Sequence, residues 1–182
     1  MKQRGFTLIE LMVSVTIFSI VMTIALGSLF SIAAAERKAE TLKSIVNNLH
    51  FALESMSRSI RTGTDYNCGG PASGDCASGA TILYFIDAQG RNISYCRGNI
   101  STCSDTGTAI LQSIGGSAYA PITATEAIIA NFSFYVIGSE RYPTDSLQPR
   151  VTITLNGYVK VSETQQSTFT IQTTVTQRVY DL

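Results

Sequence analysis

The sequence predicts an α+β fold in which one long N-terminal helix, apolar in its first half, carries an antiparallel β-sheet head on its second half. Three patterns predict this fold. An apolar run from Phe6 to Ala35 contains a single charged residue, Glu10. Apolar residues then recur at helical spacing to about residue 60, and beyond Gly63 they alternate as in half-buried strands.

The composition of the 182-residue chain fits one domain with an appendage. Hydrophobic residues make up 45% of the chain, and 13 basic residues balance 13 acidic ones. The sequence contains no block of basic residues, so it does not indicate binding to nucleic acid or to anionic lipid. Polyanion binding is therefore not among the predicted functions.

The apolar run is long enough to cross a membrane as a helix, because it has about 30 residues where about 20 are sufficient. Lys2 and Arg4 precede it, and the tendency of basic residues to stay in the cytoplasm puts the C-terminal part of the chain across the membrane. A plain membrane anchor is one simpler interpretation. The other is a signal peptide cleaved after Ala35, but the apolar region of a signal peptide has only about 7 to 15 residues.

Glu10 is the residue that a plain anchor does not explain. A carboxylate near the bilayer centre costs about 2.5 to 3.5 kcal/mol even on the most lenient insertion scale. Glu10 lies about one helical turn into the apolar run, near the expected membrane interface. A residue of this kind indicates a charged partner or a function.

The residues around Glu10 resemble the processing site of type IV prepilins and type II secretion pseudopilins. The shared motif is a short basic leader, then Gly5 and Phe6, then Thr-Leu-Ile-Glu at the start of the apolar helix. The resemblance is close over roughly the first thirty residues and extends to the remainder only in architecture. The motif is specific, because all of these features must coincide ahead of a long apolar run.

This resemblance implies a processing pathway. A prepilin peptidase in the membrane is expected to cleave after Gly5 and to methylate the new amino group of Phe6. Other pilin or pseudopilin subunits and an inner-membrane assembly platform are the expected partners. Glu10 is expected to pair with the N-terminal amine of a neighbouring subunit, and this pairing offsets the cost of a carboxylate in lipid.

The implied function is that of a structural subunit of a type IV pilus or of a type II secretion pseudopilus. The expected location is the bacterial inner membrane, as a single-pass protein with its head on the periplasmic or extracellular side. Two alternatives belong to other classes. One is a monomeric membrane-tethered receptor or adhesin head, and the other is a secreted enzyme.

The helix is predicted to continue past the membrane to residue 62, where Gly63 begins a stop signal. It has about 57 residues and is about 85 Å long at 1.5 Å per residue. Many major pilins have a proline midway along the apolar run, whereas this chain has only Gly27 there, which favours a pseudopilin or minor pilin. The residues of the predicted buried face share spacings of three and four: Leu42, Ile45 or Val46, Leu49, Leu53, Met56 and Ile60.

All four cysteines, Cys68, Cys76, Cys96 and Cys103, follow the helix. In an oxidising compartment they are expected to form disulfides. A metal site is the alternative, but their spacings and the lack of a nearby histidine do not match zinc motifs. Of the three possible pairings we prefer Cys68 with Cys76 and Cys96 with Cys103, since each closes a loop rich in small polar residues.

The head is predicted to be one twisted antiparallel sheet on the apolar face of the helix. Asn156-Gly157 fits a two-residue hairpin turn, but alternation continues through Val159 and Val161, so this strand boundary stays open. Five segments carry the strand pattern, and the first two form a hairpin: 81–87, 92–97, 128–136, 151–156 and 169–176.

No catalytic residue, metal ligand or cofactor is predicted. The sequence contains no Ser/His/Asp set, HExxH, P-loop or GxGxxG. Its only histidine, His50, lies at the edge of the apolar helix face, and its loop aspartates lack the spacing of a calcium loop. We therefore expect no enzyme, and we divide the chain into a leader (1–5), a transmembrane helix (6–35), the amphipathic half of the helix (36–62) and a disulfide-containing head (63–182).

Overall fold

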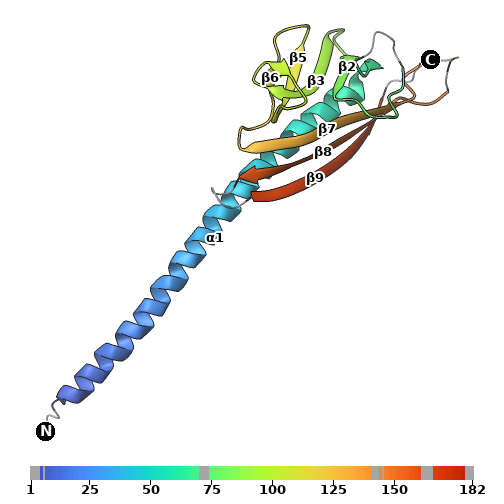
Figure 1. Ribbon diagram of the computed structural model, residues 1–182. Helices are drawn as coiled ribbons and strands as arrows, with labels where there is room; N and C mark the ends of the chain where they lie inside the picture. The colour runs from blue at the N-terminus through green and yellow to red at the C-terminus, as the bar shows by residue number, and fades with distance from the viewer. Residues whose placement is uncertain are drawn as a thin grey trace. The chain divides into compact units, whose positions relative to one another are not determined.

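The computed structural model describes residues 5, 7–69, 74–140, 144, 146–160 and 166–178 of the chain. The chain divides into two compact units, residues 1–41 and residues 42–182. The first unit contains the N-terminal part of helix α1, and the second contains the C-terminal part of α1 and the strands (Figure 1). The predicted α+β class is confirmed.

Helix α1 runs without interruption from Leu8 to Thr62, so its end lies where the sequence predicts it. Gly63 follows the last helical residue, and a glycine is needed there because the backbone passes very close to strand β2 (Ile82–Ile86). A Cβ on Gly63 would lie 2.4 Å from Cδ2 of Phe85. The single proton of the Tyr66 hydroxyl is shared between the carbonyls of Ile60 (2.6 Å) and Gly63 (2.8 Å), which ties Tyr66 to the last turn.

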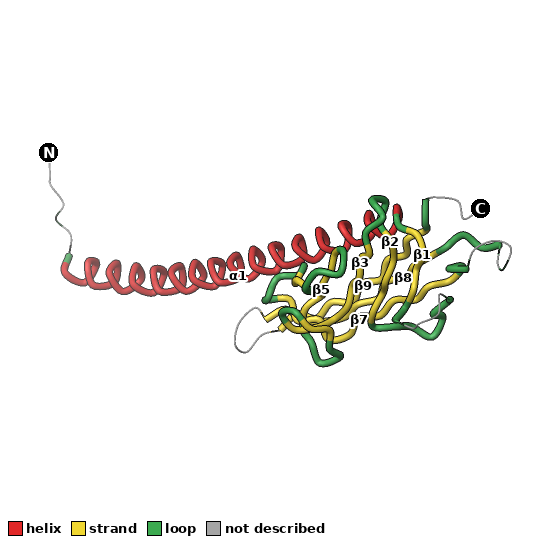
Figure 2. Tube along the Cα trace, turned by 90° about the horizontal axis from the view of Figure 1, so that it is seen from above, coloured by secondary structure: helices red, strands yellow, loops and turns green. Residues whose placement is uncertain are grey.

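The C-terminal part of α1 buries one face in the head, and the strands lie along it (Figure 2). Of the two candidates for one position of this face, Ile45 is buried and Val46 is 57% exposed. Leu42 is half-buried, and Ala52 is a buried member of the face that the sequence analysis did not include. The buried residues of this face are Ile45, Leu49, Ala52, Leu53, Met56 and Ile60.

The first sheet has six strands, with β1, β2, β3, β5 and β6 in this order and β4 paired with β3. The predicted hairpin is confirmed by β2 and β3, which pair antiparallel from Ile82 opposite Cys96 to Ile86 opposite Asn92. The short strands of this sheet carried no clear sequence pattern. Besides β2, its strands are β1 (Thr64–Asn67), β3 (Asn92–Asn99), β4 (Thr102–Cys103), β5 (Ala109–Ile114) and β6 (Ala120–Pro121).

The second sheet is an antiparallel meander of three long strands, β7 (Ala127–Ile137), β8 (Arg150–Lys160) and β9 (Gln166–Thr176). These strands include the three remaining predicted segments. Asn156-Gly157 lies inside β8 and is not a turn. Gly157 is needed there because a Cβ would lie 2.2 Å from the carbonyl oxygen of Ile128 on β7.

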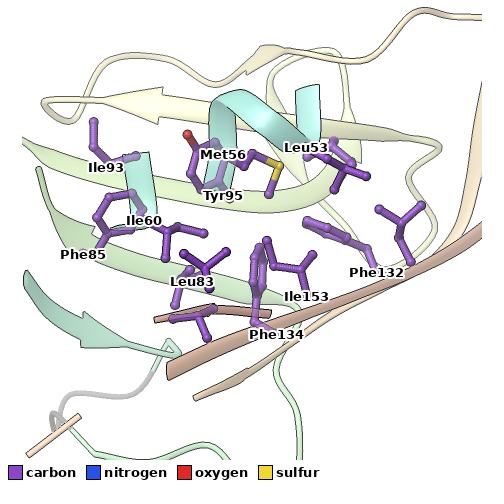
Figure 3. Packing of buried hydrophobic residues seen from close by; sticks show 14 of the residues in the cluster. Leu53, Met56, Ile60, Leu83, Phe85, Ile93, Tyr95, Phe132, Phe134 and Ile153 are labelled. Atoms are coloured by element: carbon purple, nitrogen blue, oxygen red, sulfur yellow. The ribbon is translucent and has the colours of Figure 1, made fainter. Parts of the chain in front are cut away.

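The expectation of a single sheet is wrong, because the two sheets are joined only locally. Ala80 forms an isolated bridge with Phe134, with N–H···O distances of 2.8 Å in both directions. Gly79, just before it, has φ +86° and directs the chain out of an extended path. The pairing therefore does not continue into a ladder, although the apolar faces of both sheets and α1 share one core (Figure 3).

The turn between β2 and β3 is held by Asp87, whose side chain is buried. Asp87 Oδ1 accepts hydrogen bonds from the backbone N–H groups of Gln89 (2.9 Å) and Arg91 (2.8 Å), and Oδ2 accepts one from Arg91 Nε (2.8 Å). Burial acts to raise the pKa of Asp87, but the hydrogen bonds from Arg91 and Gln89 and the charge of Arg91 outweigh it. The pKa of Asp87 therefore lies below its usual value.

An Asp87→Asn variant should lose the pH dependence that this carboxylate gives to folding stability. Because the folded-state pKa lies below the unfolded value of about 3.9, ionised Asp87 stabilises the fold above that value, and this contribution disappears as the pH falls through the folded-state pKa. Thermal unfolding of both proteins in detergent, from about pH 7 to about pH 2, should show a difference in melting temperature that closes at acidic pH. A constant difference across the series would contradict an effect of charge.

Candidate functional site

The candidate site is the N-terminal segment of α1, where the sequence places Gly5, Phe6 and Glu10. Thr7 caps the helix: the backbone N–H of Glu10 donates to Thr7 Oγ1 (3.4 Å), and the N–H of Leu11 donates to the Thr7 carbonyl (3.2 Å). Thr-x-x-Glu is the sequence of a capping box, in which the two side chains accept hydrogen bonds from backbone N–H groups that have no partner within the helix. The sequence analysis missed this cap, although its pattern was present.

Glu10 lies in the first turn of α1, and its side chain is exposed. The positive end of the helix dipole stabilises a negative charge at this position. Within the isolated chain, the helix N-terminus is thus a favourable environment for the Glu10 carboxylate. A second positive group at this end, such as an amine, would add to that stabilisation.

Gly5 is exposed, and a Cβ placed on it would meet no other atom within 4 Å. Phe6 lies outside the described residues, as do Lys2 and Arg4. The structure therefore brings Thr7 and Glu10 together and shows Gly5 open to its surroundings.

The apolar side chains that follow are exposed along the whole N-terminal part of α1. Among the described residues, α1 is the one helix that is long and apolar enough to cross a membrane. Apolar surface left in water is unfavourable by about 25 cal/mol per Å², so lipid or another protein must cover it. The large side chains concerned are Leu8, Ile9, Leu11, Met12, Val13, Val15, Ile17, Phe18, Ile20, Val21, Met22, Ile24, Leu26, Leu29, Phe30 and Ile32.

Four hydroxyl groups in this apolar segment donate hydrogen bonds to the backbone of the helix itself. An unpaired hydroxyl in an apolar medium costs about 1 to 3 kcal/mol, and donation to the backbone removes that cost. The sequence analysis did not single these residues out, although serine and threonine inside an apolar run are the signal. Each donates to the carbonyl four residues earlier, at 2.7 to 2.8 Å: Ser14, Thr16, Ser19 and Thr23.

In the head, Cys68 is bonded to Cys76 and Cys96 to Cys103. These are the local pairs that we prefer from the sequence, and none of the described cysteines is free. The second disulfide joins β3 to β4, and the sulfur-bearing side chain of Cys96 is fully buried. The cysteines therefore fasten loops of the head.

The remaining candidates from the sequence lie apart from one another. His50 is exposed on α1. Asp75 accepts hydrogen bonds from the backbone N–H (2.9 Å) and the hydroxyl (3.1 Å) of Ser139, and Asp87 holds the β2–β3 turn. The described part of the chain contains no group of three or more His, Cys, Asp or Glu side chains that could hold a metal ion.

Comparison with known proteins finds a family model that matches the N-terminal segment. Residues 1–26 match the prokaryotic N-terminal methylation motif. This match includes Gly5, Phe6 and Glu10 together with most of the exposed apolar segment of α1. No curated protein and no solved structure matches the chain.

Proposed function

Because residues 1–26 are the signal motif of type IV pilins and pseudopilins, we propose that this chain is a structural subunit of a type IV pilus or a type II secretion pseudopilus that polymerises through its N-terminal helix. The motif points to pilin-like subunits in general. The observation that carries the finer proposal is the uncovered apolar surface of α1 directly after the motif. Such a surface fits lipid before assembly and other helices after it.

Processing begins with removal of the leader, residues 1–5. A prepilin peptidase cleaves the bond between Gly5 and Phe6 and methylates the amino group of Phe6. The exposure of Gly5 supports this step, because the peptidase must bind the backbone on both sides of the bond it cleaves. The new amine belongs to the residue directly before Thr7 in the sequence, four residues before Glu10.

Assembly joins Glu10 of one subunit to the N-terminal amine of another. In lipid, an unpaired carboxylate is unfavourable, and the helix dipole offsets only part of that cost. A neighbour's amine supplies a full positive charge in a medium where ion pairs are strong. The inner-membrane assembly platform and the other pilin or pseudopilin subunits are the proposed partners.

The chain fits an inner-membrane-anchored pilin, with one apolar N-terminal helix. In the proposed arrangement residues 6–35 cross the membrane once, residues 36–62 continue the helix, and residues 63–182 form a head on the periplasmic or extracellular side. The role is structural and not enzymatic. The hydroxyl groups of Ser14, Thr16, Ser19 and Thr23 support the membrane location, since each bonds back to the backbone of α1.

The mature protein is expected to begin at Phe6 and to carry one methyl group on its amine. Intact-mass measurement of the protein purified from its own membrane tests this. A chain that begins at Glu36 would establish a signal peptide, and one that retains Met1 would establish a plain anchor.

Two glycine variants provide a matched comparison for this measurement. Gly5→Val should remain unprocessed because it alters the cleavage site, whereas Gly27→Val should be processed normally. Apart from its chain neighbours and the nearby backbone of α1 itself, neither Cβ would meet a described atom within 4 Å, so crowding against other parts of the subunit does not distinguish the two variants. Normal processing of Gly5→Val would argue against cleavage at this bond.

A further inference from the structure

We propose that the free edge of β9 is a docking site for an extended segment of a second copy of this chain, which adds to the three-stranded sheet as a fourth strand. In the order β7-β8-β9, strand β9 lies at the edge and, among the described residues, pairs only with β8. This inference rests on the proposed polymerisation, which brings heads together. It adds a contact made by the head to those made by the helix.

The other edges of the head carry features that prevent pairing with another chain. Strand β1 has four residues, an irregular register and the charged Asp65, and β6 has two residues, one of them Pro121. The outer side of β7 is partly occupied, since Ala80 bridges to it and the N–H of Ile129 donates to the carbonyl of Thr108 (2.9 Å). Short strands, bulges, charges and proline are the usual means of protecting a sheet edge.

Strand β9 has none of these features. It has 11 residues, and its pairing with β8 is continuous from Gln166 to Thr176 without a bulge. Its sequence, QSTFTIQTTVT, contains neither a charged residue nor proline. A long, regular and uncharged edge is a template for strand addition.

The side chains of β9 also fit an added strand. Phe169 and Ile171 point toward the core and pack against it, yet both remain partly exposed because they lie at its margin. A further strand would cover them, while Thr170 and Gln172 would remain on the opposite, exposed face. Docking would thus bury apolar surface. It would also give the N–H and C=O groups on the outer edge of β9 hydrogen-bond partners on the added strand.

The absence of charge favours a second copy as the occupant. Like charges directly opposite each other destabilise a strand pair, and copies of one chain repeat the same charges in every contact. An edge without charge avoids this repulsion in a polymer of identical heads. The same argument predicts that introduced lysines would prevent docking.

Hydrogen exchange can detect this contact. In the detergent-solubilised subunit, the amides of β9 that point away from β8 should exchange quickly. In assembled filaments they should exchange about 10- to 100-fold more slowly, because they become paired. Amides of the central strand β8 are the internal control. Equal exchange of the β9 edge in subunit and filament would overturn the proposal.

Matched double variants test the edge directly. Thr170→Lys with Gln172→Lys places two lysines on the edge strand, whereas Thr152→Lys with Thr154→Lys places two on the same face of the central strand β8. With both variants folded, as judged by circular dichroism, the edge variant should incorporate into filaments about tenfold less than the control. Equal incorporation would overturn the inference.

The outcome for the proposed function can be read separately. Filaments that form with wild-type yield from the edge variant, but not from a Glu10 variant, would refute the β9 contact alone. Failure of the wild-type chain to enter any filament would instead refute the proposed function.

Discussion

A Glu10→Ala variant is expected to enter the membrane at least as well as the wild type and to be lost from filaments. Removing a carboxylate from the apolar segment lowers the cost of insertion. The same change removes the proposed partner of a neighbour's amine. If that ion pair contributes as little as about 1.4 kcal/mol, incorporation should fall about tenfold. The measurement compares the amount of subunit in the membrane fraction with the amount in sheared or cross-linked filaments.

Two further variants separate charge from helix capping. Glu10→Gln keeps the shape and can still complete a capping box, but it cannot form an ion pair, so it should fail in assembly as Glu10→Ala does. Thr7→Ala removes the Oγ1 that accepts from the Glu10 N–H and keeps the charge. It should cost about 0.5 to 2 kcal/mol of helix stability and leave assembly largely intact. Normal incorporation of both Glu10 variants would refute the assembly role.

A Phe134→Ala variant is expected to lower the free energy of unfolding by about 3 to 5 kcal/mol. The Phe134 side chain is fully buried and meets Phe132 edge to face, with 4.6 Å between ring centroids. Its backbone also bridges to Ala80 where the two sheets meet. The truncation therefore leaves a cavity where both sheets and α1 share the core (Figure 3).

Phe51→Ala is the matched control, because Phe51 is 73% exposed on α1. Exposed substitutions usually change stability by less than about 0.5 kcal/mol. Thermal unfolding of the full chain in detergent should show Phe134→Ala melting about 6 to 20 °C lower than wild type and Phe51→Ala close to it. Equal shifts for both variants would contradict the core assignment.

Long periodic patterns could be predicted from the sequence, and short strands could not. Apolar spacing and Gly63 are local signals, so the end of α1 at Thr62 was predicted correctly. Strands such as β4 and β6 have two residues each, too few for alternation to be visible. Their existence depends on longer partners that the sequence pattern does not identify.

Tertiary contacts account for the other differences. The choice between Ile45 and Val46 depends on how the sheets lie on the helix, which no spacing rule specifies. The head has two sheets and not one because the bridge between Ala80 and Phe134, which follows Gly79 with its positive φ, does not continue into a ladder. Asn156-Gly157 resembles a turn locally, but pairing with β7 and β9 on both sides keeps it extended.

The candidate site does not depend on tertiary contacts in this way, because its residues are close together in the sequence. Gly5, Phe6 and Glu10 lie within six residues and can be identified without any tertiary structure. The Thr-x-x-Glu pattern of the Thr7 cap is equally local and could have been predicted from the sequence. The open edge of β9 could not be found this way, since an edge is defined by the absence of a neighbouring strand.

The two disulfides have a consequence for the order of events when the head first folds. Their cysteines are separated by only eight and seven residues, and loops of about this length close in about 10 to 100 ns. Each cysteine therefore meets its own partner long before distant strands find one another. We therefore expect the head to need an oxidant, but no disulfide isomerase, to form these two pairs.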